Sequence, residues 1–164
     1  MNDRTRPFKP GEHFDVYPGL EQDPYAARGK LPEPAVCKNC GAVHQGGHWR
    51  WQAPPKEAEQ VLCTACRRIA DGLPAGYVHI DGEFATAHHD EVMQIVRGHE
   101  ARAKAEHPMQ RIMSVDEDGT TTVITTTDVH LARDIGTTLK ADFQGKLELK
   151  YGPGESLVRV HWRR

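Results

Sequence analysis

The sequence predicts an α+β protein in which a four-cysteine metal finger precedes a larger domain of helices and strands. Three observations support this class. All four cysteines of the 164-residue chain lie between Cys37 and Cys66, as two C-x-x-C pairs. From Gly76 onward, helix-like and strand-like hydrophobic patterns alternate. Six prolines fall in the first 36 residues. The expected parts are an arm at 1–36, a finger at 37–75 and an α+β domain at 76–164.

The arm is expected to be extended or disordered. Proline lacks a backbone N–H and disfavours helix interiors and central strands. Five apolar residues interrupt this composition, and they could pin the arm onto the folded part or onto a partner protein; a loosely held tail is the other interpretation. These residues are Phe14, Val16, Tyr17, Leu20 and Tyr25.

The cysteine spacing predicts a closed metal site. Cys37 and Cys40 form the first pair, and Cys63 and Cys66 form the second after twenty-two intervening residues. Two such turns facing each other present four thiolates in a tetrahedron, which suits a structural zinc ion with no open coordination position. Four thiolates also hold iron, so an iron–sulfur cluster is the main alternative. A redox pair or four ordinary buried thiols fit the paired spacing less well.

Between the two pairs the pattern is that of a small finger. Trp49 and Trp51 alternate with polar residues as on one face of a strand, and Gly46-Gly47 supplies a hairpin turn before it. Residues 63–73 have the spacing of a short helix that starts on the second cysteine pair. A knuckle, a hairpin and a helix in this order predict a treble-clef-like or ribbon-like finger.

The remaining chain is expected to form seven elements in the order β-α-β-β-α-β-β. This order suggests a ferredoxin-like split βαβ arrangement with an added C-terminal strand. Asp128 is the expected N-cap of the helix with the clearest apolar stripe. The expected strands are 77–80, 110–115, 121–126, 147–151 and 157–163, and the expected helices are 90–106 and 128–144.

The net charge and the absence of several motifs limit which classes of function we expect. The formal net charge is −2, and only the 37–75 segment is net basic, with five basic and three acidic side chains. No phosphate-binding glycine loop or nucleophile elbow occurs, so we expect no enzyme activity. No apolar run reaches the length of a membrane span, the N-terminal residues lack a signal-peptide core, and metal-holding thiols fit a reducing compartment. We therefore expect a cytoplasmic protein.

One short segment invites an enzymatic interpretation. His88-His89-Asp90-Glu91 looks like a metal or nuclease cluster, but its histidines are adjacent rather than four positions apart as on a zinc-binding helix. A helix N-terminus with acidic residues in its first turn explains the segment more simply. A metal-dependent nuclease using His88 and His89 is the least favoured of the functional hypotheses.

Binding is the better supported prediction. Basic residues near the cysteines could form one face for a phosphate backbone, and two tryptophans could stack on unpaired bases. The candidate RNA-binding residues are Lys38, Arg50, Arg67, Arg68, Trp49 and Trp51. Packing over a small metal core is the alternative role for the tryptophans. A second basic face could lie on the C-terminal hairpin, with Lys146, Lys150, Arg159 and Arg163 and with Arg111 alongside, although a solvated strand face is the favoured explanation of these charges.

The arrangement resembles the zinc-binding N-terminal region of the large-ribosomal-subunit export-adaptor family, which is associated by name with nonsense-mediated decay and has archaeal members. The resembling features are the pairs Cys37-x-x-Cys40-Gly41 and Cys63-x-x-Cys66-Arg67, and the segment from Asp128 to Leu147. The resemblance implies a zinc-binding module that acts on ribosomal RNA or protein, in a small bacterial relative.

We therefore expect a non-enzymatic, cytoplasmic zinc-binding protein that contacts RNA or the ribosome. A protein–protein adaptor with purely structural zinc, whose proline-rich arm recruits the partner, is the competing hypothesis.

Overall fold

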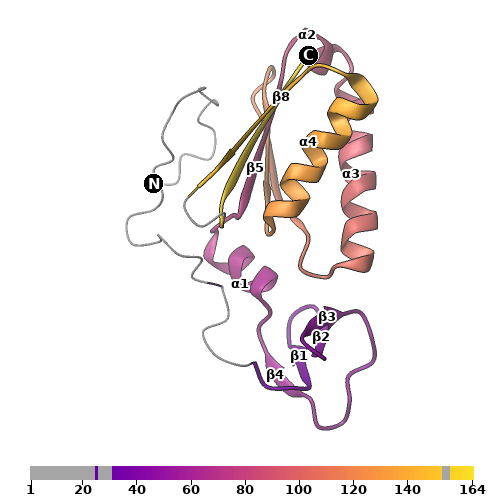
Figure 1. Ribbon diagram of the computed structural model, residues 1–164, viewed down its shortest axis with the longest axis vertical. Helices are drawn as coiled ribbons and strands as arrows, with labels where there is room; N and C mark the ends of the chain where they lie inside the picture. The colour runs from indigo at the N-terminus through magenta and orange to yellow at the C-terminus, as the bar shows by residue number, and fades with distance from the viewer. Residues whose placement is uncertain (1–24, 26–30, 153–155) are drawn as a thin grey trace.

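The computed structural model describes Tyr25, residues 31–152 and residues 156–164. Most of the arm expected at 1–36, including Phe14, Val16, Tyr17 and Leu20, lies outside the described residues. The described chain is a mixed α+β structure, as the sequence predicted, and it contains two sheets and four helices. Figure 1 shows α3 and α4 side by side on one side of the larger sheet, with the small sheet beyond the lower end of these helices.

The small sheet contains four strands in the order β3-β2-β1-β4. The expected hairpin is present: β2 and β3 pair antiparallel, and Gly46 and Gly47 between them have φ angles of 64° and 79°. Parallel pairing of β1 with β4 was not anticipated. The elements are β1 (Ala35–Cys37), β2 (Val43–Gln45), β3 (His48–Arg50), β4 (Glu59–Val61) and the following helix α1 (Thr64–Asp71).

The second part carries the larger sheet and three helices. The short helix α2 was not expected, whereas the two longer helices and the five strands match the predicted elements to within a few residues. The elements are β5 (Gly76–Asp81), α2 (Glu83–Ala87), α3 (His89–Glu106), β6 (Ile112–Glu117), β7 (Thr122–Thr126), α4 (Val129–Phe143), β8 (Lys146–Tyr151) and β9 (Val158–Arg163).

The order of the larger sheet is β6-β7-β5-β9-β8, which differs from the ferredoxin-like expectation. Instead of adding outside, β9 lies between β5 and β8 and runs parallel to β5. Burial explains the placement, because Val158, Val160 and Trp162 of β9 are all 0% exposed. On β8, by contrast, Leu149 is 41% exposed. The strand with the fully buried face takes the central position.

One core holds the helices on the sheet. Leu131, Ile135 and Leu139 of α4 pack with Val78, Ile124 and the inner face of β9. The expected cap is present, since Oδ1 of Asp128 accepts a hydrogen bond from Leu131 N at 3.0 Å. Gly136 lets α4 approach the sheet closely: a Cβ there would lie 2.4 Å from Cγ1 of Val160.

The sheet face away from the helices is polar. Because side chains alternate along a strand, Tyr77 and His79 point opposite to Val78 and Ile80 of the core. His161 lies opposite His79 on β9, and its Nε2 is 2.9 Å from Oδ2 of Asp81. Burial, followed by the charges of Arg159 and His161, lowers the pKa of His79 to about 4, against an opposing contribution from Asp81.

Within the described ranges, no helix is long and apolar enough to cross a membrane.

Candidate metal centre

The four cysteines converge at one point. Their Sγ atoms all lie within 4.8 Å of one another, and the cysteines are free thiols rather than disulfides. Cys37, Cys63 and Cys66 are buried, at 1%, 0% and 3% exposure, and Cys40 is half-buried. The Sγ atoms of Cys40 and Cys63 are 3.8 Å apart. A tetrahedron with metal–sulfur bonds of about 2.3 Å has edges of about 3.8 Å, so the spacing fits a tetrahedral thiolate site.

Local backbone geometry prepares the sulfurs for a cation. The amide of Cys63 donates to Sγ of Cys37 at 3.4 Å, and the amide of Cys66 donates to Sγ of Cys63 at 3.3 Å, which also caps α1. Burial raises the pKa of Cys37, but amides of Cys63, Cys40 and Asn39 outweigh it and lower that pKa to about 6. Cys37 is therefore largely a thiolate at neutral pH, the form that binds metals.

The thiols of Cys40 and Cys63 ionise less readily than that of Cys37. Burial raises the pKa of both Cys40 and Cys63, and in Cys63 the neighbouring thiols raise it further. Four thiolates this close together repel one another unless a cation lies between or beside them. A bound metal ion meets that requirement from inside the cluster.

A second cation reaches the cluster from the α+β domain. Nη1 of Arg111 donates to Sγ of Cys66 at 3.3 Å, and Nη2 donates to Sγ of Cys40 at 3.1 Å and to Sγ of Cys63 at 3.8 Å. Nε donates to the carbonyl of Pro108 at 2.8 Å, and the side chain is 7% exposed. Burial lowers the pKa of Arg111, but the hydrogen bonds to Cys66 and Cys40 outweigh it and raise that pKa.

This placement corrects the sequence prediction that Arg111 lies alongside the basic face of the C-terminal hairpin. Arg111 directly precedes β6 and is held inward by Thr127, whose Oγ1 accepts from the Arg111 amide at 3.0 Å. No local pattern in the sequence distinguishes Arg111 from a surface arginine, because its partners come from residues 40, 63 and 66.

Further contacts join the finger to the last turn of α3 and to the segment that follows it. Nε1 of Trp51 donates to the carbonyl of Lys104 at 2.7 Å, and the guanidinium of Arg111 lies 5.7 Å from the centre of the Trp51 ring. The Thr64 hydroxyl donates to Sδ of Met109 at 3.2 Å, and Met109 packs against the cysteines. The four-cysteine cluster therefore lies at the contact between the two parts.

The predicted basic residues separate into two groups. Lys38, Arg50 and Arg67 are exposed. Arg68 is only 7% exposed; its Nη1 donates to the carbonyl of Leu73 at 3.2 Å, and its guanidinium lies 4.4 Å over the Tyr25 ring. Arg68 therefore does not share an exposed basic face with its neighbour.

The two tryptophans also differ in environment. Trp49 is half-buried, packs against the cysteine cluster and lies 5.1 Å from the His44 ring. Trp51 follows the end of β3 and is 40% exposed. Trp49 therefore has the role of packing over the metal core, which was the alternative to base stacking, whereas Trp51 has an exposed ring surface.

An open groove runs between the β2–β3 hairpin and the segment that leads from α3 to β6. Its volume is about 500 Å³. The finger contributes Trp49 and the exposed Arg50, whereas the domain contributes the carboxylates of Glu106 and Asp128. The lining residues are Gly47, His48, Trp49, Arg50, Glu106, His107, Pro108, Met109, Gln110 and Asp128.

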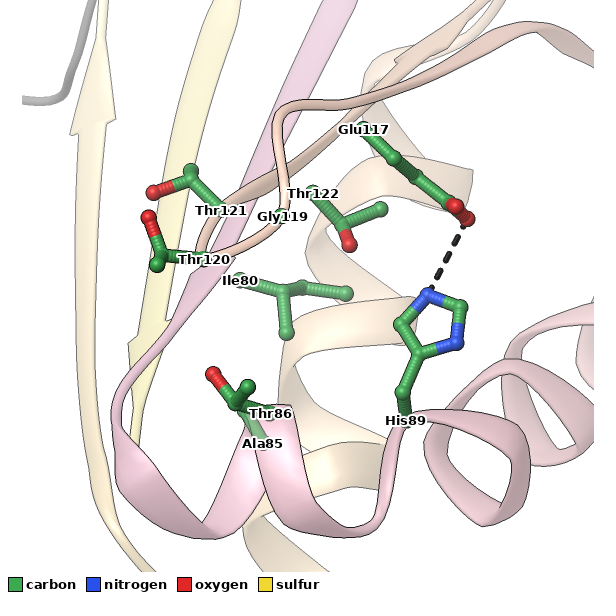
Figure 2. A pocket seen from close by; sticks show the side chains of 9 residues that line it. All are labelled: Ile80, Ala85, Thr86, His89, Glu117, Gly119, Thr120, Thr121 and Thr122. Atoms are coloured by element: carbon green, nitrogen blue, oxygen red, sulfur yellow. Dashed lines mark ion pairs between the residues drawn. The ribbon is translucent and has the colours of Figure 1, made fainter.

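A smaller pocket of about 160 Å³ lies beside the β6–β7 hairpin, and His89 points into it (Figure 2). Nε2 of His89 is 3.0 Å from Oε1 of Glu117. His88 turns elsewhere: it stacks on Phe84 at 4.2 Å and pairs with Glu91 at 3.2 Å. The pocket is lined by Ile80, Ala85, Thr86, His89, Glu117, Gly119, Thr120, Thr121 and Thr122.

The two adjacent histidines thus do not converge on one ion. Within the part of the chain that the structure describes, the four cysteines are the only group of three or more side chains placed to hold a metal. The simpler interpretation of residues 88–91 agrees with the structure, since α3 begins at His89 and has Asp90 and Glu91 in its first turn.

Comparison of the chain with protein-family models, curated proteins and solved structures finds no match. No comparison therefore links the chain to the export-adaptor family.

Proposed function

We propose that the four cysteines bind one zinc ion and that this ion is structural, completing a treble-clef-like finger. The observation that carries the proposal is the set of four sulfurs within 4.8 Å of one another. Four cysteine ligands fill a tetrahedral zinc ion, so no position remains for water or substrate. When bound, zinc supplies a cross-link and positive charge. The residues around it hold the finger against the α+β domain, and we infer a non-enzymatic role.

Metal analysis tests the proposal. Purified protein should contain one zinc per chain, and Cys63→Ser should lose it, because Cys63 is one of the four ligands and is 0% exposed. A coloured protein that contains iron would contradict the choice of zinc. A protein that contains no metal and keeps all four thiols equally reactive would contradict the site itself.

We further propose that the groove beside the metal centre binds single-stranded RNA, with ribosomal RNA as the source. Trp49 offers an aromatic wall whose ring is held in place by His44 and the cysteine cluster. Arg50 lines the groove, and the exposed Lys38 follows the first cysteine. A base stacked on a fixed aromatic ring with cations for its phosphates is the usual way in which unpaired RNA is held. Arg68 is left out because its guanidinium is buried against Tyr25.

The test is a salt series with a fluorescent single-stranded RNA. Affinity should fall steeply as salt rises, and Arg50→Gln should weaken binding and reduce the salt slope by about 1. Lys140→Gln is the matched control, because Lys140 is an exposed cation in the last turn of α4. Binding that does not depend on salt, or equal effects of both substitutions, would remove the groove from RNA recognition.

Two carboxylates favour a second candidate, a protein–protein adaptor. Glu106 and Asp128 line the same groove and would attract a basic segment of a partner protein rather than phosphate. Capture of a partner that survives nuclease treatment and is lost on Glu106→Gln would support the adaptor. Capture that disappears with nuclease would support RNA.

A further inference from the structure

The strand β8 is an open edge of the larger sheet. It pairs with β9 along its full length, from Lys146 opposite Arg163 to Tyr151 opposite Val158. Among the described residues, no strand pairs with its other side. The six residues of β8 contain no proline and their register is unbroken. An uninterrupted edge of this kind can receive another strand through its backbone N–H and C=O groups.

Exposed apolar side chains gather on the same strand. In the described part of the chain, four large hydrophobic residues are exposed, and two of them are Leu149 at 41% and Tyr151 at 42%. Both lie on the face of β8 that carries Leu147, which packs against the core. The apolar face of the sheet therefore continues beyond the helices up to this edge.

The opposite edge of the sheet is built differently. The register of β6 shifts between Ile112 and Ser114, and the amide of Ile112 is occupied by Oε1 of Glu100 at 2.8 Å. Asp116 and Glu117 add two carboxylates at its end. Bulges and charges of this kind protect an edge from pairing. Of the two edge strands of the larger sheet in the described residues, β8 alone combines a regular backbone with exposed large apolar side chains.

We propose that β8 pairs antiparallel with β8 of a second copy of this chain, around a two-fold axis at Leu149. Residues whose numbers sum to 298 then lie opposite each other. Leu149 faces Leu149 and Leu147 faces Tyr151 on the helix side of the sheet. On the other side, Glu148 of each copy faces Lys150 of the other.

Charge selects this register over its neighbours. With the axis at Glu148, the Glu148 residues of the two copies face each other and Lys146 faces Lys150. With the axis at Lys150, the two Lys150 residues face each other. Like charges directly opposite each other destabilise a pair of strands, whereas opposite charges stabilise it. An axis between two residues is excluded, because facing side chains of an antiparallel pair lie on the same face of the sheet, whereas neighbours along one strand, such as Glu148 and Leu149, lie on opposite faces.

The environment of Lys150 supports the same arrangement. Within one chain, Lys150 lies opposite Arg159 of β9, which brings two cations together on the polar face. Glu148 of the second copy would lie on the other side of Lys150 and place a carboxylate next to this basic pair. Glu148 already pairs with Lys146 at 2.7 Å, so charges alternate along the joined strands.

The test is a charge exchange in the full chain, followed by analytical ultracentrifugation. Wild-type protein should form dimers at about 100 µM, a concentration suited to a weak interface. Glu148→Lys alone sets cations opposite Lys150, and Lys150→Glu alone sets carboxylates opposite Glu148. Each variant should weaken the dimer about tenfold or more. An equal mixture of the two variants should form dimers again, because every facing pair is then opposite in charge.

Several results would overturn the proposal: a monomeric wild type, single variants that remain dimeric, or a mixture that stays monomeric. Circular dichroism checks that both variants are folded. If either unfolds, Leu149→Arg serves instead, because it sets two cations on the axis at an exposed position. Dimers that persist in Leu149→Arg would equally exclude β8 as the interface.

Discussion

Nη2 of Arg111 lies 3.1 Å from Sγ of Cys40, although 71 positions separate them in the chain. A guanidinium from the α+β domain thus contacts the four-cysteine cluster of the finger. Zinc held by four thiolates has a net charge of −2, and one arginine at hydrogen-bonding distance offsets half of it. Metal binding and the contact between the two parts are therefore expected to depend on each other.

Replacing Arg111 should weaken metal binding and the contact between the finger and the α+β domain. Arg111→Gln removes charge-assisted hydrogen bonds to three sulfurs, and we expect the free energy of unfolding to fall by about 1.5–3 kcal/mol. Zinc should also pass to a competing chelator more readily. Arg111→Lys keeps the charge but not the planar fork that reaches two sulfurs at once, so its effect should be intermediate. Chelator competition and thermal unfolding measure both effects.

Arg67→Gln is the control for this comparison. Arg67 lies on α1 directly after the second cysteine pair, but it is exposed. Its removal should change neither zinc retention nor stability by more than about 0.5 kcal/mol. If Arg111→Gln behaved like Arg67→Gln, the arginine would have no part in holding the metal.

Removing the metal should open the finger before the domain. The apolar cluster of the finger consists of little more than the cysteines, whereas the domain has a core of fourteen buried residues. Hydrogen exchange with and without chelator should show faster exchange of amides in β1–β4 and α1, with β5, β7 and β9 still protected. Unchanged protection of the finger in metal-free protein would contradict a structural role for the metal.

Gly136 offers a test of how closely α4 packs on the sheet. A Cβ at this position would lie 2.4 Å from Cγ1 of Val160 and 2.9 Å from Cδ1 of Leu147. Gly136→Ala should therefore overpack the core and lower the free energy of unfolding by about 1–3 kcal/mol. Urea denaturation measures the difference.

Gly98 in α3 is the matched control, because the nearest atom to its added Cβ is the flexible end of Arg102, at 3.6 Å. Gly98→Ala should stabilise the protein by about 0.5–1 kcal/mol, since alanine favours a helix interior over glycine. Equal effects of the two substitutions would mean that α4 does not touch the sheet at Gly136.

His79 should make stability depend on pH. Its folded-state pKa of about 4 lies below the ordinary histidine value of 6.5, so between these values the unfolded chain binds more protons than the folded one. The contribution of neutral His79 to the free energy of unfolding is fully present above about pH 6.5 and is lost as the pH falls towards 4. We expect a loss of about 2 kcal/mol between pH 7 and pH 5.

Urea denaturation at pH 5, 6 and 7 tests this, and His79→Gln should flatten the dependence. His48→Gln, at an exposed position, serves as the control. If His79→Gln and wild type lose stability in parallel, protonation of another group explains the pH effect.

The features that the sequence predicted correctly depend on short spacings. Each C-x-x-C turn brings its own two sulfurs together, and Gly46-Gly47 closes the β2–β3 hairpin, which spans the eight residues 43–50. The stripe of Leu131, Ile135 and Leu139 likewise needs only helical periodicity.

The features that were missed depend on distant residues. Arg67 and Arg68 are equally basic in sequence, but successive residues on a helix point about 100° apart, and only the packing of α1 decides which one is buried. The strands β8 and β9 both alternate apolar and polar residues, so the pattern does not say which is central. Arg111 reads as an ordinary strand-end arginine until β6 and the finger are placed together.

The central position of β9 has a consequence for how the molecule acquires its structure. The strand β5 pairs in parallel with β9, and Gly76 lies opposite Val158. A contact between residues so far apart in sequence closes late and slowly, because the chain loses much loop entropy before the pairing rewards it. During synthesis, β5, β6 and β7 can pair first. The edge of β5 that contains Val78 and Ile80 then has no partner strand until β9 has been synthesised. All four cysteines precede the first strand of the larger sheet, so the finger, with the zinc that we propose, can begin to fold well before that sheet is complete.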